Sequence, residues 1–315
     1  MDKEVEAQVI SGVQERMFFF SVLIANYNNG RYLQEAIDSV LAQTYTNWEI
    51  VLVDDKSTDN STEIYRKYED DPRFHIYYNE ENKGCGYTKR RCVELAKGEL
   101  CGFLDPDDKL TSDALEIMTK THLEHPHCSL AYSTLYLWND KQDTIKVLED
   151  VGAMEKGEDF LISSKKIVSH FAVFKKAFYD KTIGIDETLS SAVDFDLYVK
   201  LEEEGVLCYI NRPLYYYRQG NVNSISIGSS ELKNIAFANR VKASLNAFAR
   251  RIKGKHPLFL AHKQKCLHVM RWQLGYYHKN IERHSVRWLR YAYWYWRGND
   301  YSIKSLSHIR KAMVR

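Results

Sequence analysis

Residues 98–110 of the chain read GELCGFLDPDDKL, an apolar run that ends in a cluster of acids. Residues 100–104 have the composition of a buried strand, and Asp105, Asp107 and Asp108 follow at its end. Open α/β sheets bind ligands outside the carboxyl ends of their strands, where acids can hold a hard cation and, through it, a phosphate. The same segment could instead be a polar turn whose acids cap the next helix. The remainder of the chain has to decide between a ligand site and a turn.

Three more strand-and-loop units come before this stretch. The apolar run 17–25 leads through an Asn-rich loop into a segment with apolar residues every three or four positions, as on one helix face. Residues 48–53 end in Asp54 and Asp55, and residues 74–78 lead through a glycine-containing loop into another helical segment. Strands that alternate with helices of about ten to fifteen residues predict βαβ units and a mainly parallel, Rossmann-like central sheet flanked by helices. We therefore expect an α/β fold that brings polar groups from distant segments to one sheet edge.

Two common phosphate-binding motifs are absent from the sequence. The first strand is not followed by Gly-x-Gly-x-x-Gly, which disfavours a dinucleotide fold, and the chain contains no Gly-x-x-x-x-Gly-Lys-Ser/Thr, which disfavours a P-loop. Phosphates at this sheet edge would therefore need a metal ion rather than a glycine cradle.

The composition indicates a soluble protein with a large core. The 315 residues are 44% hydrophobic and 13% aromatic, which suits one large domain or one domain with an appendage. The acidic start does not resemble a signal peptide, and the apolar stretches are far shorter than the roughly 20 residues of a membrane helix. Six scattered cysteines without a Cys-x-x-Cys pair fit reduced thiols. We expect a cytoplasmic protein.

The net charge of +2 hides a strong asymmetry along the chain. Residues 229–315 contain 19 Lys and Arg and three acids, whereas residues 1–228 contain 25 basic and 39 acidic residues. The basic part is helical in pattern, with aromatic residues such as Trp288 and Tyr291 interleaved with Arg287 and Arg290. Such helices could lie peripherally on the anionic inner face of the cell membrane, or they could form a cap that packs on the preceding domain.

Four segments carry a family resemblance through their order and spacing. They are SVLIANYNNGRYLQEAIDSVLAQTYTNWEIVLVDDKSTDNS (21–61), NKGCGYTKRRCVELAKGE (82–99), FLDPDD (103–108) and AVDFDLYVKL (192–201). In this order they resemble the inverting family 2 glycosyltransferases with the GT-A fold, of the type that builds bacterial capsule and O-antigen polysaccharides. The resemblance covers roughly residues 18–228. It implies a nucleotide-diphosphate sugar as donor, with a UDP-sugar favoured, Mn²⁺ or Mg²⁺ as cofactor, and a saccharide or lipid-linked acceptor.

The resemblance assigns four residues to the nucleoside and phosphates of the donor. Ala25 and Tyr27, at the end of the first strand, would meet the base and ribose by backbone contact and by stacking. Asp55 would accept a hydrogen bond from the nucleobase, since a carboxylate suits the imide N–H of uracil. Lys89 stands where relatives usually have an arginine, and would contact the uridine or a phosphate as a point charge.

The acidic stretch receives divided roles from the same resemblance. Asp105 would reach the ribose, and Asp107 would bind the metal ion, which neutralises the diphosphate as it leaves. For Asp108 the resemblance gives no clear role, and capping a helix that starts near Thr111 is an adequate account.

The catalytic base is expected in the fourth segment. In the family this segment usually reads Glu-Asp-x-Asp-Leu, and the first Asp deprotonates the acceptor hydroxyl. Here Val193 replaces the glutamate, so Asp194 is the expected base and the neighbouring carboxylate is missing. Arg218 would clamp the diphosphate when the loop 219–230 closes, although Gly220 stands where relatives often have a histidine. His170, in an expected strand over 167–174, is either a core residue or a substrate contact.

These observations divide the chain into three parts. Residues 1–16 form a flexible lead, residues 17–228 a catalytic domain with a nucleotide-binding half (17–110) and an acceptor half (111–228), and residues 229–315 a basic, aromatic helical region. Two other functions stay open. A nucleotidyltransferase would normally show a glycine-rich loop after the first strand, which residues 26–30 do not form. The basic region could also make the protein a membrane-binding or single-stranded nucleic-acid-binding module, with nucleic acid the less expected partner.

Overall fold

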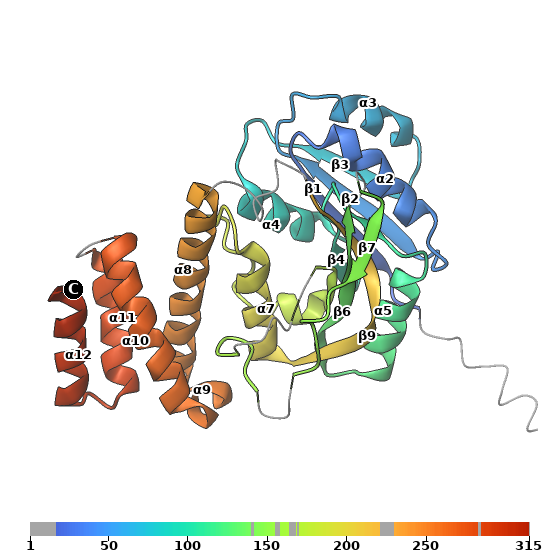
Figure 1. The fold of residues 1–315 in the computed structure, drawn as a ribbon. Coiled ribbons are helices and arrows are strands. Elements are labelled where there is room, and N and C mark those ends of the chain that lie inside the picture. Colours follow the sequence, from blue (N-terminus) through green and yellow to red (C-terminus); the bar gives the residue numbers. More distant parts are fainter. Residues whose placement is uncertain are drawn as a thin grey trace, which may run out of the picture.

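The computed structural model describes residues 17–139, 142–154, 158–163, 168, 170–220, 230–282 and 285–314. The predicted lead, residues 1–16, lies outside them. The described strands form a nine-stranded sheet in the order β3-β2-β1-β4-β8-β6-β9-β5, with β7 paired to β6 (Figure 1). The strands are β1 (Phe20–Asn26), β2 (Trp48–Asp54), β3 (Phe74–Tyr78), β4 (Leu100–Phe103), β5 (Lys109–Leu110), β6 (Cys128–Asn139), β7 (Thr144–Val147), β8 (Ala172–Lys175) and β9 (Val206–Arg218).

The first four strands form the parallel half of the sheet that the sequence predicts. β1 pairs in parallel with both β2 and β4, and β2 pairs in parallel with β3. The connecting helices are α2 (Gly30–Leu41), α3 (Ser61–Tyr65) with the short helix η1 (Arg66–Tyr68), and α4 (Cys85–Leu95). α2 buries Leu33, Ile37 and Val40 along one face, as its apolar spacing requires. The carboxyl ends of these strands therefore meet at one edge.

The second half of the sheet is mixed rather than parallel. β8 is antiparallel to β4 and β6, whereas β6 and β9 are parallel. The expected strand over 167–174 is wrong at its start, because the strand begins only at Ala172. Phe171 has a φ of 53° and His170 lies in a bend, so the extended backbone cannot begin earlier. The remaining helices of this half are α5 (Ala114–Glu124), α6 (Lys176–Tyr179) and α7 (Val193–Glu204).

The basic C-terminal region is helical, and its first helix packs against α7 (Figure 1). Its helices are α8 (Ser230–Gly254), α9 (Pro257–Ala261), α10 (Lys263–Asn280), α11 (Val286–Gly298) and α12 (Ile303–Val314). Phe248, Tyr277 and Trp288 belong to the same buried cluster as Leu197 of α7. α8 thus packs on the preceding part of the chain, as the cap interpretation expects, and α10 and α11 pack on α8. None of the described helices combines the length and the apolar composition needed to cross a membrane. The boundary predicted near residue 228 falls among undescribed residues and stays a prediction.

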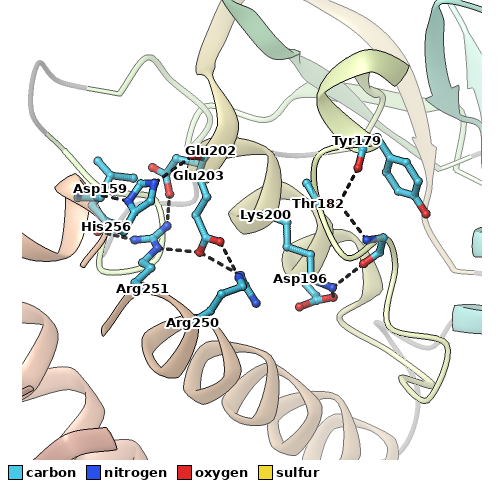
Figure 2. A network of polar contacts seen from close by, with 12 residues as sticks. Asp159, Tyr179, Thr182, Asp196, Lys200, Glu202, Glu203, Arg250, Arg251 and His256 are labelled. Carbon is cyan, nitrogen blue, oxygen red and sulfur yellow. Dashed lines mark hydrogen bonds and ion pairs between the residues drawn. The ribbon is translucent and has the colours of Figure 1, made fainter. Parts of the chain in front are cut away.

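Arg251 of α8 fastens the helical region to the rest of the protein (Figure 2). Its guanidinium donates to Asp159 at 2.7 Å, to Glu202 at 2.8 Å and to Glu203 at 2.9 Å, and its side chain is 0% exposed. The pKa of Glu202 is raised to about 7, because burial and the charge of Asp159, which raise it, outweigh Arg251, which lowers it. Arg250 binds Glu203 as well, from a half-buried position. The joint between the two regions is therefore a buried and charged one.

We expect Arg251→Met to destabilise the protein by about 3–5 kcal/mol, because it leaves Asp159 and Glu202 buried without their cation. Urea unfolding at pH 8 measures this loss. The loss should shrink at pH 5.5, where the orphaned carboxyls can take up protons.

Arg250→Met is the matched control and should cost about 1 kcal/mol or less, since Arg250 is partly exposed. Equal losses in the two variants would show that Arg251 is not the fastening residue.

Candidate active site

A buried ammonium lies at the centre of the site. Nζ of Lys89, on α4, is 2.9 Å from Oδ1 of Asp194 and 3.3 Å from Oδ1 of Asp105. Asp194 lies in the first turn of α7, and Asp105 follows β4. Lys89 is 6% exposed, whereas both carboxylates are partly open to solvent. The structure therefore brings together three of the residues that the sequence predicts, from three separate segments.

The charges of this cluster stabilise one another. Burial acts to lower the pKa of the Lys89 ammonium, but Asp105 and Asp194 outweigh it and raise that pKa well above its ordinary value. Burial likewise acts to raise the pKa of Asp105, and Lys89 and His170 oppose it strongly enough to leave that pKa below its ordinary value. Lys89 is thus held as a cation and Asp105 as an anion.

His170 joins the cluster from the bend before β8. Its Nδ1 is 3.6 Å from Oδ2 of Asp105, and its ring stacks on Tyr217 with ring centres 4.9 Å apart. The contact with Asp105 could not be predicted from the sequence, because His170 was expected to lie within a strand. The bend, which the positive φ of Phe171 marks, turns the imidazole toward the acidic stretch.

Asp108 does not cap a helix, contrary to the account considered from the sequence. Helix α5 begins at Ala114, with Asp113 at its N-terminal cap position. Asp108 instead accepts hydrogen bonds from the Tyr215 hydroxyl and from the Arg218 backbone N–H, both at 2.7 Å. Burial, with the charges of Asp107 and Asp105, raises the pKa of Asp108 well above its ordinary value. Asp108 therefore ties the acidic loop to the end of β9.

Arg218 is buried against the acidic loop. Its Nε donates to the backbone oxygen of Asp107 at 2.8 Å, and its Nη2 donates to Glu35 at 3.0 Å. The guanidinium carbon lies 4.0 Å from the ring centre of Trp138 and 4.5 Å from that of Tyr32. These contacts place Arg218 beside Asp107 but direct its guanidinium into the protein. Most of the loop that was expected to close, residues 221–229, lies outside the described residues.

Asp55 is a buried acceptor at the end of β2. Its Oδ1 accepts from the Asn79 side chain at 2.7 Å and from the Lys83 backbone at 2.8 Å, and its Oδ2 accepts from the Gly84 backbone at 2.8 Å. The φ of Gly84 is 86°, a conformation that favours glycine. Since a carboxylate offers about four acceptor positions, one remains for a nucleobase N–H.

Ala25 and Tyr27 lie beside Asp55 at the same sheet edge. Ala25 pairs with Val53 in the parallel ladder and is half-buried. Tyr27 follows β1 and is 48% exposed, so its ring is open to a flat ligand. The two residues border the place where β1 and β2 end.

Asp107 is half-buried and lies between Asp105 and Asp108. Among the described residues, no group of three or more His, Cys, Asp or Glu side chains is arranged to hold a metal ion. The described side chains therefore provide carboxylate oxygens but not a complete set of metal ligands. This donor set suits Mg²⁺ or Mn²⁺ only if a ligand such as a diphosphate supplies further oxygens, which is how such ions are commonly bound.

Sequence reasoning missed two residues that shape the site. Asn79 follows β3 directly, so the strand-end argument applied to Asp55 could have found it. Tyr215 lies in the middle of β9, and its hydroxyl meets both Asp108 and the backbone N–H of Asp105. Nothing in its local sequence indicates that contact.

Comparisons with known proteins agree with this geometry. The chondroitin synthase of Escherichia coli is 31% identical over 215 residues, which cover 66% of this chain and 30% of that protein. The hyaluronan synthase of Pasteurella multocida is 32% identical over 201 residues, or 64% of this chain and 20% of that protein. The chain thus spans less than a third of the length of these two relatives.

A crystal structure of Staphylococcus aureus TarS, residues 1–349, superposes with a TM-score of 0.59 at 17% identity, covering 94% of this chain and 90% of that one. TarS has also been crystallised with UDP and with UDP-GlcNAc. This likeness confirms the predicted GT-A architecture. Residues 21–183, more than half of the chain, match the family model for Glycosyl transferase family 2. The chain therefore belongs to glycosyl transferase family 2.

Proposed function

We propose that this protein transfers one sugar from a UDP-sugar to a saccharide or lipid-linked acceptor, with inversion, in the synthesis of a cell-surface polysaccharide. The observation that carries the proposal is the Lys89 cluster, which joins the expected ribose contact, Asp105, to the expected base, Asp194. The ammonium of Lys89 would thereby contact both a residue that binds the donor nucleotide and the residue that deprotonates the acceptor.

The nucleoside would lie across the ends of β1 and β2. Tyr27 offers an exposed ring for stacking on the base, and Asp55 has one acceptor position left for the imide N–H. Ala25 would contact the base through its backbone. Two of the three N–H donors of Lys89 meet carboxylates, so the third can bind a donor oxygen. The UDP-bound and UDP-GlcNAc-bound forms of TarS support a uridine donor.

Asp194 would act as the general base. Its carboxylate takes the proton of the acceptor hydroxyl while the acceptor oxygen forms a bond to the anomeric carbon. The bond from that carbon to the diphosphate breaks, and its electron pair leaves with the nucleoside diphosphate. Attack opposite the leaving group inverts the anomeric centre. Since Val193 carries no charge, the charged neighbour of the base is Lys89 rather than a glutamate.

Asp107 would hold a divalent metal ion together with the diphosphate. Bound there, the ion would supply positive charge that stabilises the departing nucleoside diphosphate. Arg218 would act by positioning, since it anchors the Asp107 backbone and faces Glu35. This assignment replaces the diphosphate clamp expected from the sequence.

The chemistry of the acceptor is suggested by the relatives. Chondroitin synthase and hyaluronan synthase carry names of polysaccharide-forming enzymes, which supports a saccharide acceptor here. A nucleotidyltransferase is disfavoured by the family match and by the loop after β1, which lacks a glycine-rich sequence.

We also propose that the protein can associate with an anionic membrane through α11. Val286, Leu289 and Tyr293 are exposed at helical spacing on this helix, next to Arg290. Association at the inner face of the cell membrane would bring the enzyme to a lipid-linked acceptor.

Asp194→Asn is expected to lower kcat for sugar transfer by about 10²–10⁴-fold, because the variant cannot accept the acceptor proton. Affinity for UDP should stay within about twofold, because Asp194 meets the acceptor and not the nucleoside. Transfer assays and calorimetric UDP titrations measure the two quantities. Asp180→Asn, which removes an exposed acid on the far side, is the control and should leave both unchanged. Full transfer activity in Asp194→Asn would exclude Asp194 as the base.

Asp107→Asn is expected to abolish the effect of Mn²⁺ on UDP binding. In the protein without substitutions, Mn²⁺ should increase the affinity for UDP by about tenfold, since Asp107 would hold the ion and the ion would supply positive charge to the diphosphate. Asp71→Asn, at the opposite sheet edge beside Arg73, should retain that effect. If neither Mn²⁺ nor Mg²⁺ alters the UDP affinity of the protein without substitutions, the proposed metal role of Asp107 is wrong. The proposed nucleotide site is not contradicted by that result.

Leu289→Glu is expected to reduce sedimentation with phosphatidylglycerol vesicles by about tenfold, because it places a charge in the proposed contact face. Leu260→Glu makes the same change at an exposed position of α9 and should sediment like the unchanged protein. Equal sedimentation of both variants would rule out α11 as the contact.

A further inference from the structure

Three aromatic side chains form a cluster on the surface of the C-terminal helices. The rings of Trp272 and Tyr276, one turn apart on α10, stack at 5.9 Å with an angle of 22°. Phe237 of α8 meets both edge-on, at 6.1 Å from Trp272 and 4.8 Å from Tyr276. Trp272 is 58% exposed, so the cluster presents ring faces to solvent. Phe237 braces the two rings and so helps to fix their orientation.

Basic side chains flank this cluster along the same helix faces. Lys233 precedes Phe237 by one turn of α8, and Lys279 follows Tyr276 by about one turn of α10. Both lysines are exposed. The two acids described on α10–α12 and their connections are engaged elsewhere, Glu282 near Arg287 and Asp300 with Lys263. The charged side chains described on α8 and α10 are all basic.

The helix that carries Phe237 also contacts the acceptor side of the proposed active site. Asn239, two residues after Phe237, donates to the hydroxyls of Ser190 and Ser191 at 3.0 and 2.9 Å. Ser191 lies three residues before Asp194. The first turns of α8 thus lie beside the N-terminus of α7, where the base is expected (Figure 1).

We propose that Phe237, Trp272 and Tyr276, with Lys233 and Lys279, form a binding platform for an acidic polysaccharide, the growing acceptor chain. The apolar C–H faces of sugar rings would lie on the two stacked rings, and the carboxylates of uronic acid units would pair with the lysines. The inference rests on the proposed transferase function and names the acceptor as an anionic glycan.

The observations favour a glycan over a membrane at this position. Exposed apolar side chains lie at both places, Val286 and Leu289 on α11 and Leu232 and Ile235 beside Phe237 on α8, so the ligand has to be inferred from the arrangement of rings and charges. The cluster offers two flat rings with charges at both ends, which fits a linear chain of charged rings. The excess positive charge of residues 229–315 would also attract a polyanionic chain to these helices.

The test is calorimetric titration of the full chain with a chondroitin decasaccharide, which carries carboxylates, and with a neutral dextran decasaccharide. We expect the anionic glycan alone to bind. Trp272→Ala should weaken that binding by about tenfold, because removing a protein side chain on which a ligand ring stacks costs on the order of 1–3 kcal/mol in other proteins that bind chain-like ligands. The double variant Lys233→Gln, Lys279→Gln should reduce the salt dependence of binding.

Tyr301→Ala, which removes an exposed ring from the connection between α11 and α12, is the matched control and should bind like the unchanged protein. UDP titration of each variant shows whether it is folded and keeps the donor site, so failure of the platform and failure of the transferase proposal can be told apart. Unchanged glycan binding by Trp272→Ala overturns the proposal. Equal binding of the neutral dextran overturns it as well.

Discussion

The buried ammonium of Lys89 constrains the whole site. Taking an unpaired charge out of water costs several kcal/mol, so a lysine that is 6% exposed has to keep its carboxylates close. Asp105 and Asp194 supply them from the end of β4 and the start of α7. Because each partner belongs to a different segment, the contact fixes the position of α7 relative to the parallel half of the sheet. The residues assigned to donor and acceptor are then held together before any ligand arrives.

A second contact of the same kind holds the acidic loop. Asp108 is buried and accepts hydrogen bonds from Tyr215 and from the Arg218 backbone, which tie the loop to β9. The neighbouring Asp107 is thereby left half-buried at the sheet edge, as a carboxylate that can meet a ligand. Of three acids in one short loop, Asp105 faces Lys89, Asp108 supports the loop and Asp107 is half-buried between them. This division follows from burial rather than from residue type.

Strand ends could be read from the sequence, and long-range partners could not. The apolar runs and their terminal acids located β1, β2, β3 and β4, and with them Asp55 and Asp105, because parallel strands end at one edge. The roles of Asp108 and Arg218 depend on contacts more than a hundred residues away, to Tyr215 and Glu35. The position of His170 depends on the φ of Phe171, which no periodicity reveals. The local spacing of apolar residues thus predicts the strands and helices. The different contacts of the acids after β4 depend on Tyr215 and Arg218 of β9, which are distant in the sequence.

The contacts between the basic helical region, residues 229–315, and the acidic remainder of the chain use only some of the basic side chains. Arg250 and Arg251 bind acids of the catalytic half, so only part of the positive charge of the helical region is used in the joint. Most of the other described lysines and arginines of these helices are exposed, whereas residues 1–228 are acidic overall. A polyanionic chain would be attracted to the helices and repelled by the acidic residues 1–228. Such a field would draw the body of an acidic acceptor onto α8 and α10 and leave its end free to enter at the N-terminus of α7.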